Sequence, residues 1–327
     1  MNLIRCAIPL CLAAGMLPGC GGAQLPMHAP GGLTAEGDRA AFGAPGTTPP
    51  ELLYVTDNSY ASYYAYPQGK LAGKLTGFTS AVGDCADSEG NVFIPDQVAA
   101  QVYEYPHGST KRIADLQTHV SPAGCAIDPV TGDLAVSGGA PKGGGVDIFK
   151  GAKGSATFYK APQFFSTQFC GFDAKGNLFV DGLKDTKGNP MFAELPKGSH
   201  TFKQITLNAT IDGSGGVQWD GKDIAVGGYI PPKGNNSKPV IYRFAITGTQ
   251  GKKVGTTMLG SPAHFISFQF AIAGATVIVP NWYFEGIKNK YDVLFYKYPA
   301  GGAPTKTLTG GISMPHGAAI SRDSASL

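Results

Sequence analysis

Charged residues are scarce in this sequence, and their scarcity excludes several classes of protein. Asp, Glu, Lys and Arg make up only 15% of the 327 residues, and the formal net charge is +3. Lys and Arg never form a run longer than a pair. Because nucleic-acid-binding proteins carry a basic stripe or patch, we expect no nucleic-acid partner.

Several catalytic motifs are also absent. The chain has no Gly-x-Ser-x-Gly elbow, no His-Glu-x-x-His pair and no glycine-rich phosphate loop. These motifs position the nucleophile, the zinc ligands and the phosphate groups in large classes of enzyme. Their absence argues against a serine hydrolase, a zinc protease and a nucleotide-dependent enzyme.

A long hydrophobic run is missing as well. The apolar stretch Cys6–Leu17 is shorter than the ~20 residues that a membrane-spanning helix needs. It follows the charge of Arg5 and ends beside small residues, an order typical of a secretory signal peptide. We therefore predict that residues 1–19 are a signal peptide and that the chain is exported.

The end of this segment, Leu17-Pro18-Gly19-Cys20, resembles the lipobox of bacterial lipoproteins. The resemblance implies cleavage before Cys20 and attachment of a diacylglycerol to its thiol, which would anchor the protein to a membrane. Gly21 in place of an aspartate implies the outer membrane of a Gram-negative host. Secretion after cleavage further along the chain is the alternative.

The remaining chain divides by composition. Residues 20–50 are rich in Gly, Ala and Pro without hydrophobic periodicity, so we predict a flexible tether there. Residues 51–327 are predicted to form the globular domain. The 47 glycines of the chain argue against a helical bundle, because glycine inside a helix costs roughly 1 kcal/mol relative to alanine.

A sequence unit recurs along the predicted domain. Units start near residues 83, 124, 170, 216 and 266, and each contains a short apolar strand, a tight turn and a second apolar strand. A hairpin turn of this kind needs a residue with positive φ. The glycines that would supply it are Gly90, Gly132, Gly176, Gly221 and Gly274.

Each unit continues with a third strand of alternating polarity, such as Val240–Phe244, and an outer strand, such as Thr201–Ile205. Four strands in a repeat of about 40–50 residues are typical of a β-propeller blade. Gly317–Ser321 supplies an extra innermost strand, and residues 52–75 supply three strands that lack one. We predict an all-β, monomeric, six-bladed β-propeller closed by both chain ends, with five or seven blades as alternatives.

Some of these residues resemble the NHL repeat, namely Pro122–Asp128 followed by Gly132–Val136, and Pro315–Ile320. The wider family includes gluconolactonase-like calcium propellers, streptogramin lyase-like propellers and the zinc lyase of peptide amidation. The resemblance covers roughly residues 52–321 and implies the propeller fold, which hosts many functions. Three aspartates end segments similar to the second strand of that repeat, and we expect them to accept loop amides: Asp57, Asp96 and Asp181.

The predicted loops are long on one face of the propeller, and we expect a ligand to bind there. These loops are Ser137–Gly145, Asp181–Pro190, Gly227–Pro239 and Pro280–Tyr291. Aromatic residues in or beside them suit a sugar or a protein partner, with packing between blades as the alternative. They are Tyr60, Tyr229, Trp282, Tyr283 and Phe284.

Candidate metal ligands follow from the resemblance. The gluconolactonase-like propellers imply Ca²⁺ near the channel, and Asp84 stands where that family has a glutamate. The amidating lyase implies Zn²⁺ held by histidines that precede innermost strands, here His119, His264 and His316. Independent loop histidines are the alternative.

Three cysteines, Cys85, Cys125 and Cys170, occupy matching places on consecutive innermost strands. Three alternative roles fit them: small apolar filler at a crowded axis, one disulfide plus an odd thiol, or ligands of a soft metal. Taken together, the sequence favours a lipid-anchored, extracytoplasmic binding module for a protein, a glycan or a small molecule. A metal-dependent hydrolase of the lactonase type, or a lyase, with its ion at the channel mouth is the alternative.

Overall fold

The structure is a computed structural model that describes residues 48–140, 143–230, 238–262, 268–285 and 288–324. In these ranges antiparallel strands dominate, and a short 3-10 helix spans Lys150–Ala152. No helix among the described residues is both long enough and apolar enough to cross a membrane. The predicted signal peptide, Cys20 and most of the predicted tether lie outside the described residues.

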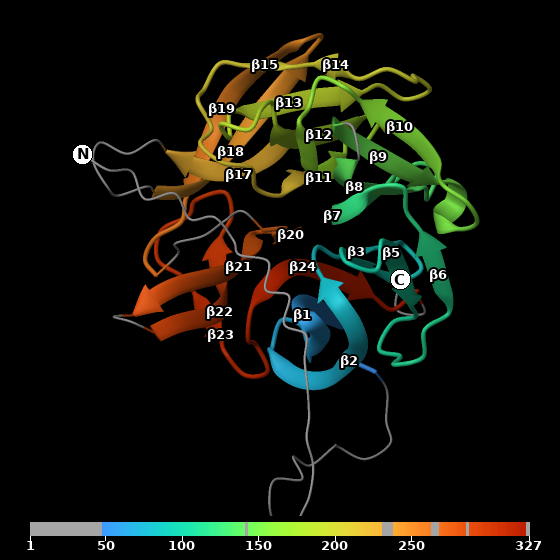
Figure 1. The fold of residues 1–327 in the computed structure, drawn as a ribbon. Coiled ribbons are helices and arrows are strands. Elements are labelled where there is room, and N and C mark those ends of the chain that lie inside the picture. The colour runs from blue at the N-terminus through green and yellow to red at the C-terminus, as the bar shows by residue number, and fades with distance from the viewer. Residues whose placement is uncertain (1–47, 141–142, 231–237, 263–267, 286–287, 325–327) are drawn as a thin grey trace, which may run out of the picture. The chain divides into compact units, whose positions relative to one another are not determined.

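The strands form successive blades, numbered here from the chain's N-terminal end (Figure 1). Blade 2 contains β3 (Cys85–Ala86), β4 (Val92–Asp96), β5 (Gln101–Tyr105) and β6 (Ala114–Gln117). Blade 3 contains β7 (Ser121–Ile127), β8 (Leu134–Ala140), β9 (Gly143–Phe149) and β10 (Thr157–Ala161). Blade 4 contains β11 (Ser166–Phe172), β12 (Leu178–Leu183), β13 (Pro190–Leu195) and β14 (Lys203–Gln204).

Blade 5 contains β16 (Val217–Trp219), β17 (Ile224–Ile230), β18 (Lys238–Thr247) and β19 (Gln250–Met258), with β15 (Thr206–Leu207) parallel to β19. Blade 6 contains β20 (Ala271–Ala273), β21 (Thr276–Glu285), β22 (Lys288–Lys297) and β23 (Lys306–Leu308). Blade 1 contains β24 (Pro315–Arg322), β1 (Glu51–Ala65) and β2 (Lys70–Ala81). The first strand of blades 2 to 6 and β24 of blade 1 are the innermost.

Blade 1 has four strands because β1 folds back on itself. Residues 51–57 of β1 pair with β24, whereas residues 58–65 pair with β2. The Tyr66 amide donates to the Glu51 carbonyl, and the rings of Tyr54 and Tyr63 stack with centroids 5.1 Å apart. The reversal lies at Asn58, whose φ is +23°. The predicted blade built from both chain ends is therefore present.

The chain ends are also held by blade 2. His107 lies in the turn after β5. Its Nδ1 is hydrogen-bonded to Ser321 Oγ, and its Nε2 lies 2.7 Å from the Pro49 carbonyl oxygen. Ser321 Oγ in turn donates to the Gly90 carbonyl. One imidazole thus ties the first and last described segments to the neighbouring blade.

The predicted hairpin turns are confirmed at every glycine that was assigned one. All five have positive φ, between 58° and 95°. The strands they connect bury apolar side chains between blades, as in the cluster where Phe179 and Phe192 of blade 4 meet Val226 and Tyr242 of blade 5. Local turn geometry and interblade packing therefore support the same register.

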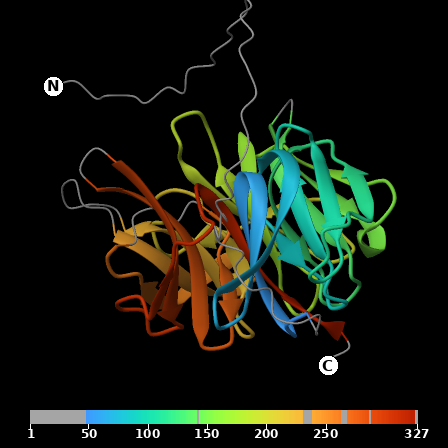
Figure 2. The same ribbon diagram turned by 90° about the horizontal axis from the view of Figure 1, so that it is seen from below.

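Two of the four predicted long loops, Ser137–Gly145 and Pro280–Tyr291, are mostly strand instead. Asp181–Pro190 keeps a turn between β12 and β13, and residues 231–237 of Gly227–Pro239 lie outside the described residues. β21 and β22 pair from Thr276–Lys297 to Glu285–Lys288, so most of Pro280–Tyr291 is a hairpin (Figure 2). β8 and β9 pair as far as Ala140 and Gly143, and β17 and β18 pair as far as Ile230 and Lys238. In each case the second strand stays paired with the third beyond the predicted strand end, so this face presents extended hairpins.

Candidate functional site

Gln269, which precedes β20, spans the axial channel of the propeller. Its Nε2 donates to the carbonyl oxygens of Asp84 (2.5 Å) and Cys125 (2.9 Å), and its Oε1 accepts from the Cys125 amide (3.2 Å). A Cβ at Gly83 would lie 2.3 Å from that Oε1, so the channel needs glycine there. Blade 6 is thereby joined to blades 2 and 3 across the axis.

Gln269 was not among the residues that we predicted to be functional. It lies in the most diverged of the five sequence units, between Phe268 and Phe270. A polar residue between two aromatic residues at an innermost strand was the available signal. Its partners are main-chain groups, which every residue has, so the sequence does not identify them.

The three predicted channel cysteines are divided between two states. Cys85 and Cys125 form a disulfide between blades 2 and 3. Cys170 is a buried free thiol, and burial raises its pKa to about 12. A disulfide with one odd thiol is therefore the arrangement present, and the neutral Cys170 side chain fills space at the axis.

Asp84 is fully buried beside the same axis. Neither of its carboxyl oxygens has a hydrogen-bond partner, and burial raises its pKa well above the usual range. A Cβ at Gly317 would lie 2.5 Å from Asp84 Oδ1, so β24 passes close to the carboxyl group.

The residues around Asp84 do not fit the calcium site that the resemblance implied. Ca²⁺ takes about six to eight oxygen ligands. Among the described residues no group of three or more His, Cys, Asp and Glu side chains could hold a metal ion. Asp84 is therefore an isolated buried acid in this part of the chain.

The predicted histidine ligands are not brought together. His119 Nδ1 lies 2.8 Å from Asp147 Oδ1, and its ring lies 5.8 Å from that of Phe158 on the outer strand β10. His316 instead lines the channel mouth, with its ring edge against Phe268. His264 lies outside the described residues. His119, in the loop before β7, and His316, the second residue of β24, therefore contact different parts of the propeller.

Three of the predicted aromatic residues, Tyr60, Tyr229 and Trp282, pack against neighbouring side chains of the propeller. Trp282 of β21 stacks on Tyr291 of β22, with centroids 6.4 Å apart, and its Nε1 donates to Asn289. Tyr229 packs against the apolar cluster between blades 5 and 6. The Lys74 ammonium lies 3.5 Å from the ring centroid of Tyr60. Tyr283 is half-buried, and the Phe284 side chain lies outside the described part.

The three trailing aspartates accept backbone amides, as predicted. Asp57 accepts from Ser313 and Met314, Asp96 from Thr79, Ser80 and Ala99, and Asp181 from Phe169 and Gly215. Ser313, Met314 and Gly215 lie in loops that lead into innermost strands, Thr79 and Ser80 end β2, Ala99 lies between β4 and β5, and Phe169 belongs to β11. The carboxyl groups therefore fix the loops that border the channel mouth.

The channel mouth is a cavity of about 490 Å³ on the face of the extended hairpins. Among the described residues that line it, none is Asp, Glu, Lys or Arg. Its polar lining residues are Asn58, Ser80, Gln97, Ser121, Ser166, Thr167, Gln168 and His316. Phe169 and Phe268 complete the lining.

His316 contributes an uncharged ring to this mouth. Its Nε2 is buried and has no hydrogen-bond partner, and burial lowers the pKa of the imidazole below its usual value. At neutral pH the ring is therefore neutral and can donate or accept one further hydrogen bond.

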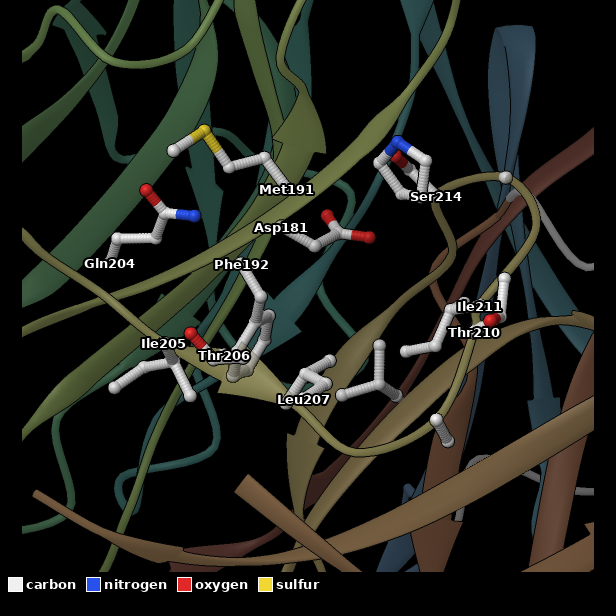
Figure 3. Close-up of a pocket in the computed structure, with 14 residues that line it drawn as sticks. Asp181, Met191, Phe192, Gln204, Ile205, Thr206, Leu207, Thr210, Ile211 and Ser214 are labelled. Carbon is white, nitrogen blue, oxygen red and sulfur yellow. The ribbon is translucent and has the colours of Figure 1, made fainter. Parts of the chain in front are cut away.

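A second pocket, of about 240 Å³, lies between blades 4 and 5 (Figure 3). It exists because the outer strand of blade 4 is short: β14 pairs only with Ala193 and Glu194, and the chain then crosses to β19 of blade 5. The start of β13, including Met191, is left without an outer partner. The segment 209–214, which leads toward β16, covers it in part.

Comparisons with solved structures identify proteins of similar fold. No protein-family model matches the chain, and no curated protein matches its sequence. A chain of a nidogen/laminin complex has a TM-score of 0.57 at 11% identity, covering 84% of this chain and 99% of that one. A protein of unknown function from Bacteroides caccae has a TM-score of 0.58 at 10% identity, covering 84% and 99%.

The β-propeller domain of Swd1 (Cps50) from Myceliophteria thermophila is similar as well. It has a TM-score of 0.50 at 11% identity and covers 81% of this chain and 86% of its own. At this identity the likeness shows the fold alone. The chain is an all-β protein with a β-propeller fold.

Proposed function

We propose that this chain is an exported, lipid-anchored β-propeller that binds neutral glycans at its channel mouth. The proposed anchor is Cys20, on the strength of its lipobox-like context. The resemblance of Pro122–Asp128 to the NHL repeat supports a place among NHL-like propellers, many of which are built for binding.

The uncharged lining of the mouth is the observation that carries the glycan assignment. A neutral sugar offers hydroxyl groups and apolar ring faces, and it is bound by amide and hydroxyl side chains beside aromatic rings. The mouth combines Gln168 and Ser121 with Phe268, and the unpartnered Nε2 of His316 suits a sugar hydroxyl. A charged ligand would find no opposite charge among these lining residues.

The test is a screen of the purified full-length protein against neutral glucans, mannans and chitooligosaccharides, followed by calorimetry. Gln168→Ala and Phe268→Ala each remove one proposed contact. We expect each to weaken binding by about threefold to tenfold, the usual net effect of one lost hydrogen bond or ring contact. Ser155→Ala, an exposed change on blade 3, is the matched control and leaves the affinity unchanged.

Two results would overturn the glycan assignment. Wild-type protein that binds none of these sugars but captures a purified envelope protein through the same mouth would be a protein-binding module. Sugar binding that disappears with a chelator and returns with Ca²⁺ would point to the metal-dependent alternative.

A further inference from the structure

We propose that the pocket between blades 4 and 5 binds a second type of ligand, a compact, uncharged and mostly apolar molecule that carries one hydrogen-bonding group. The volume of about 240 Å³ sets the size of this ligand. An apolar cavity of ~150 Å³ in a protein core is enough to take benzene. A substituted single ring or a short branched alcohol therefore fits here.

The walls of the pocket determine that the ligand is mostly apolar. Phe192, Ile205 and Ile211 line it and are themselves buried, and Val226 of β17 closes it on the side of blade 5. Figure 3 shows the side chains of Phe192, Leu207 and Ile211 along one side of the pocket. The described lining residues include no Lys, Arg, His or Glu, so they offer an anionic ligand no counter-charge.

The opposite side of the pocket is polar. Ser214 Oγ is buried and has no hydrogen-bond partner. Asp181 lies beside it in Figure 3 and uses one lone pair of each oxygen to accept the amides of Phe169 and Gly215. A buried hydroxyl without a partner is unfavourable, so a ligand hydroxyl or amide at this position satisfies a group that the fold leaves unsatisfied.

Among the described residues, two amide donors rather than a cation contact the buried Asp181 carboxyl group. Burial raises the pKa of Asp181 well above its usual range, against the opposing effect of its two amide donors. A protonated carboxyl group both donates and accepts a hydrogen bond. Together, Ser214 and Asp181 thus form a compact polar end that suits an alcohol or an amide.

The pocket is separate from the channel mouth in its lining and in its chemistry. The two cavities share none of their described lining residues, and the pocket walls are mostly apolar where the mouth is hydroxyl- and amide-rich. The proposal therefore does not depend on glycan binding at the mouth. Variants of Gln168 and Phe268 serve to tell the two sites apart.

The experiment compares two probes of similar shape on the full-length protein, benzyl alcohol and its hydrocarbon counterpart ethylbenzene. Ligand-observed NMR titration gives an affinity for each. We expect both to bind, and Ser214→Ala to weaken benzyl alcohol by about threefold to tenfold while ethylbenzene changes less than twofold. A role of Ser214 in stability alone would change both affinities equally.

Two further variants show where the probes bind. Ala209→Trp and Thr210→Trp fill the pocket from its rim and are expected to abolish binding of both probes. Ala174→Trp, an equally large change at an exposed turn of blade 4, is the matched control and leaves binding intact. Circular dichroism and the melting temperature check that each variant is folded.

The result that overturns the proposal is specific. Wild-type protein that binds neither probe up to its solubility, or folded Ala209→Trp and Thr210→Trp proteins that bind both probes normally, excludes the pocket as a site. Loss of probe binding in Phe268→Ala would instead place the probes in the channel mouth, which also contradicts the proposal.

Discussion

At the scale of single residues, buried carboxyl groups behave differently according to what faces them. Asp57 accepts amides from the segment before β24, and Asp96 accepts amides from the end of β2, so both carboxyl groups organise the channel mouth. Asp84 has the same side chain and is equally buried, but no donor reaches its oxygens. The first two are positioning groups, whereas Asp84 is a group whose charged form the fold does not stabilise.

This difference predicts a pH dependence for Asp84. Because burial raises its pKa in the folded protein, the unfolded chain loses this proton at a lower pH than the folded protein does. Stability from this group is complete below pH ~4 and falls as the pH rises toward the folded pKa. Over that pH interval, we expect the free energy of unfolding of Asp84→Asn to fall less steeply than that of the wild type, by up to ~1.4 kcal/mol per pH unit.

Urea unfolding of both proteins between pH 4 and pH 8 measures this effect. Burial also raises the pKa of Asp181, so the wild-type curve contains more than one such group. The difference between the two curves isolates Asp84. Parallel curves for wild type and Asp84→Asn would show that the Asp84 carboxyl group is not protonated preferentially in the folded state.

At the scale of elements, one turn recurs in the blades. The pattern Asp-x-x-Gly-Asn occurs at Asp87–Asn91, Asp173–Asn177 and Asp185–Asn189. In each, the aspartate accepts from the amides two and four residues later and from the asparagine side chain. The turn is therefore specified locally, independently of the rest of the blade.

The same turn should matter more where it is packed than where it projects into solvent. Asp173→Ala removes three hydrogen bonds from a turn that abuts Asp128 and Lys197, and we expect a loss of about 1–2 kcal/mol in the free energy of unfolding. Asp185→Ala removes the same bonds from the exposed tip of the β12–β13 hairpin, where water replaces them. Chemical denaturation compares the two, and an equal loss in both would contradict this account.

At the scale of the whole molecule, contacts between distant segments hold the ring of blades. β24 and β1 close the ring at blade 1, Gln269 crosses the channel, and the Cys85–Cys125 disulfide joins blades 2 and 3. The sequence separation across the disulfide is 40 residues. A crosslink of this span restricts the unfolded chain substantially.

Removing this crosslink should destabilise the protein without changing its fold. We expect the Cys85→Ala/Cys125→Ala double variant to lose about 2–4 kcal/mol in the free energy of unfolding. Cys170→Ala is the matched control, because it removes a buried thiol that forms no crosslink. Thermal unfolding with and without a reductant measures the effect. The prediction would be contradicted if the reductant left the melting temperature of the wild type unchanged and the double variant melted at the same temperature.

The location of the molecule is a prediction from the sequence. We expect Cys20→Ser to move the protein from the membrane fraction to the soluble exported fraction, because the lipid would have no attachment site. Cys11→Ser lies before the predicted cleavage site and is the control. Fractionation with mass spectrometry of the N-terminal peptide is the measurement. An unlipidated wild-type peptide would favour plain secretion.

The sequence by itself determined the repeat, the turns and the closure of blade 1. Gly90 and Gly132 could be assigned positive φ because turn geometry depends on neighbours in the chain. Asp57 could be expected to accept loop amides, but not those of Ser313 and Met314, which lie at the other end of the chain. The hairpin Pro280–Tyr291 was taken for a loop because pairing at the end of a strand depends on the opposite strand.

Only the tertiary structure decided the chemistry of the sites. The disulfide partner of Cys85, the separation of His119 from His316 and the reach of Gln269 depend on how blades face one another across the axis. The pocket at Ser214 depends on the chain crossing from blade 4 to blade 5. Such contacts join residues far apart in the chain, and their side-chain directions follow from packing that no local pattern encodes.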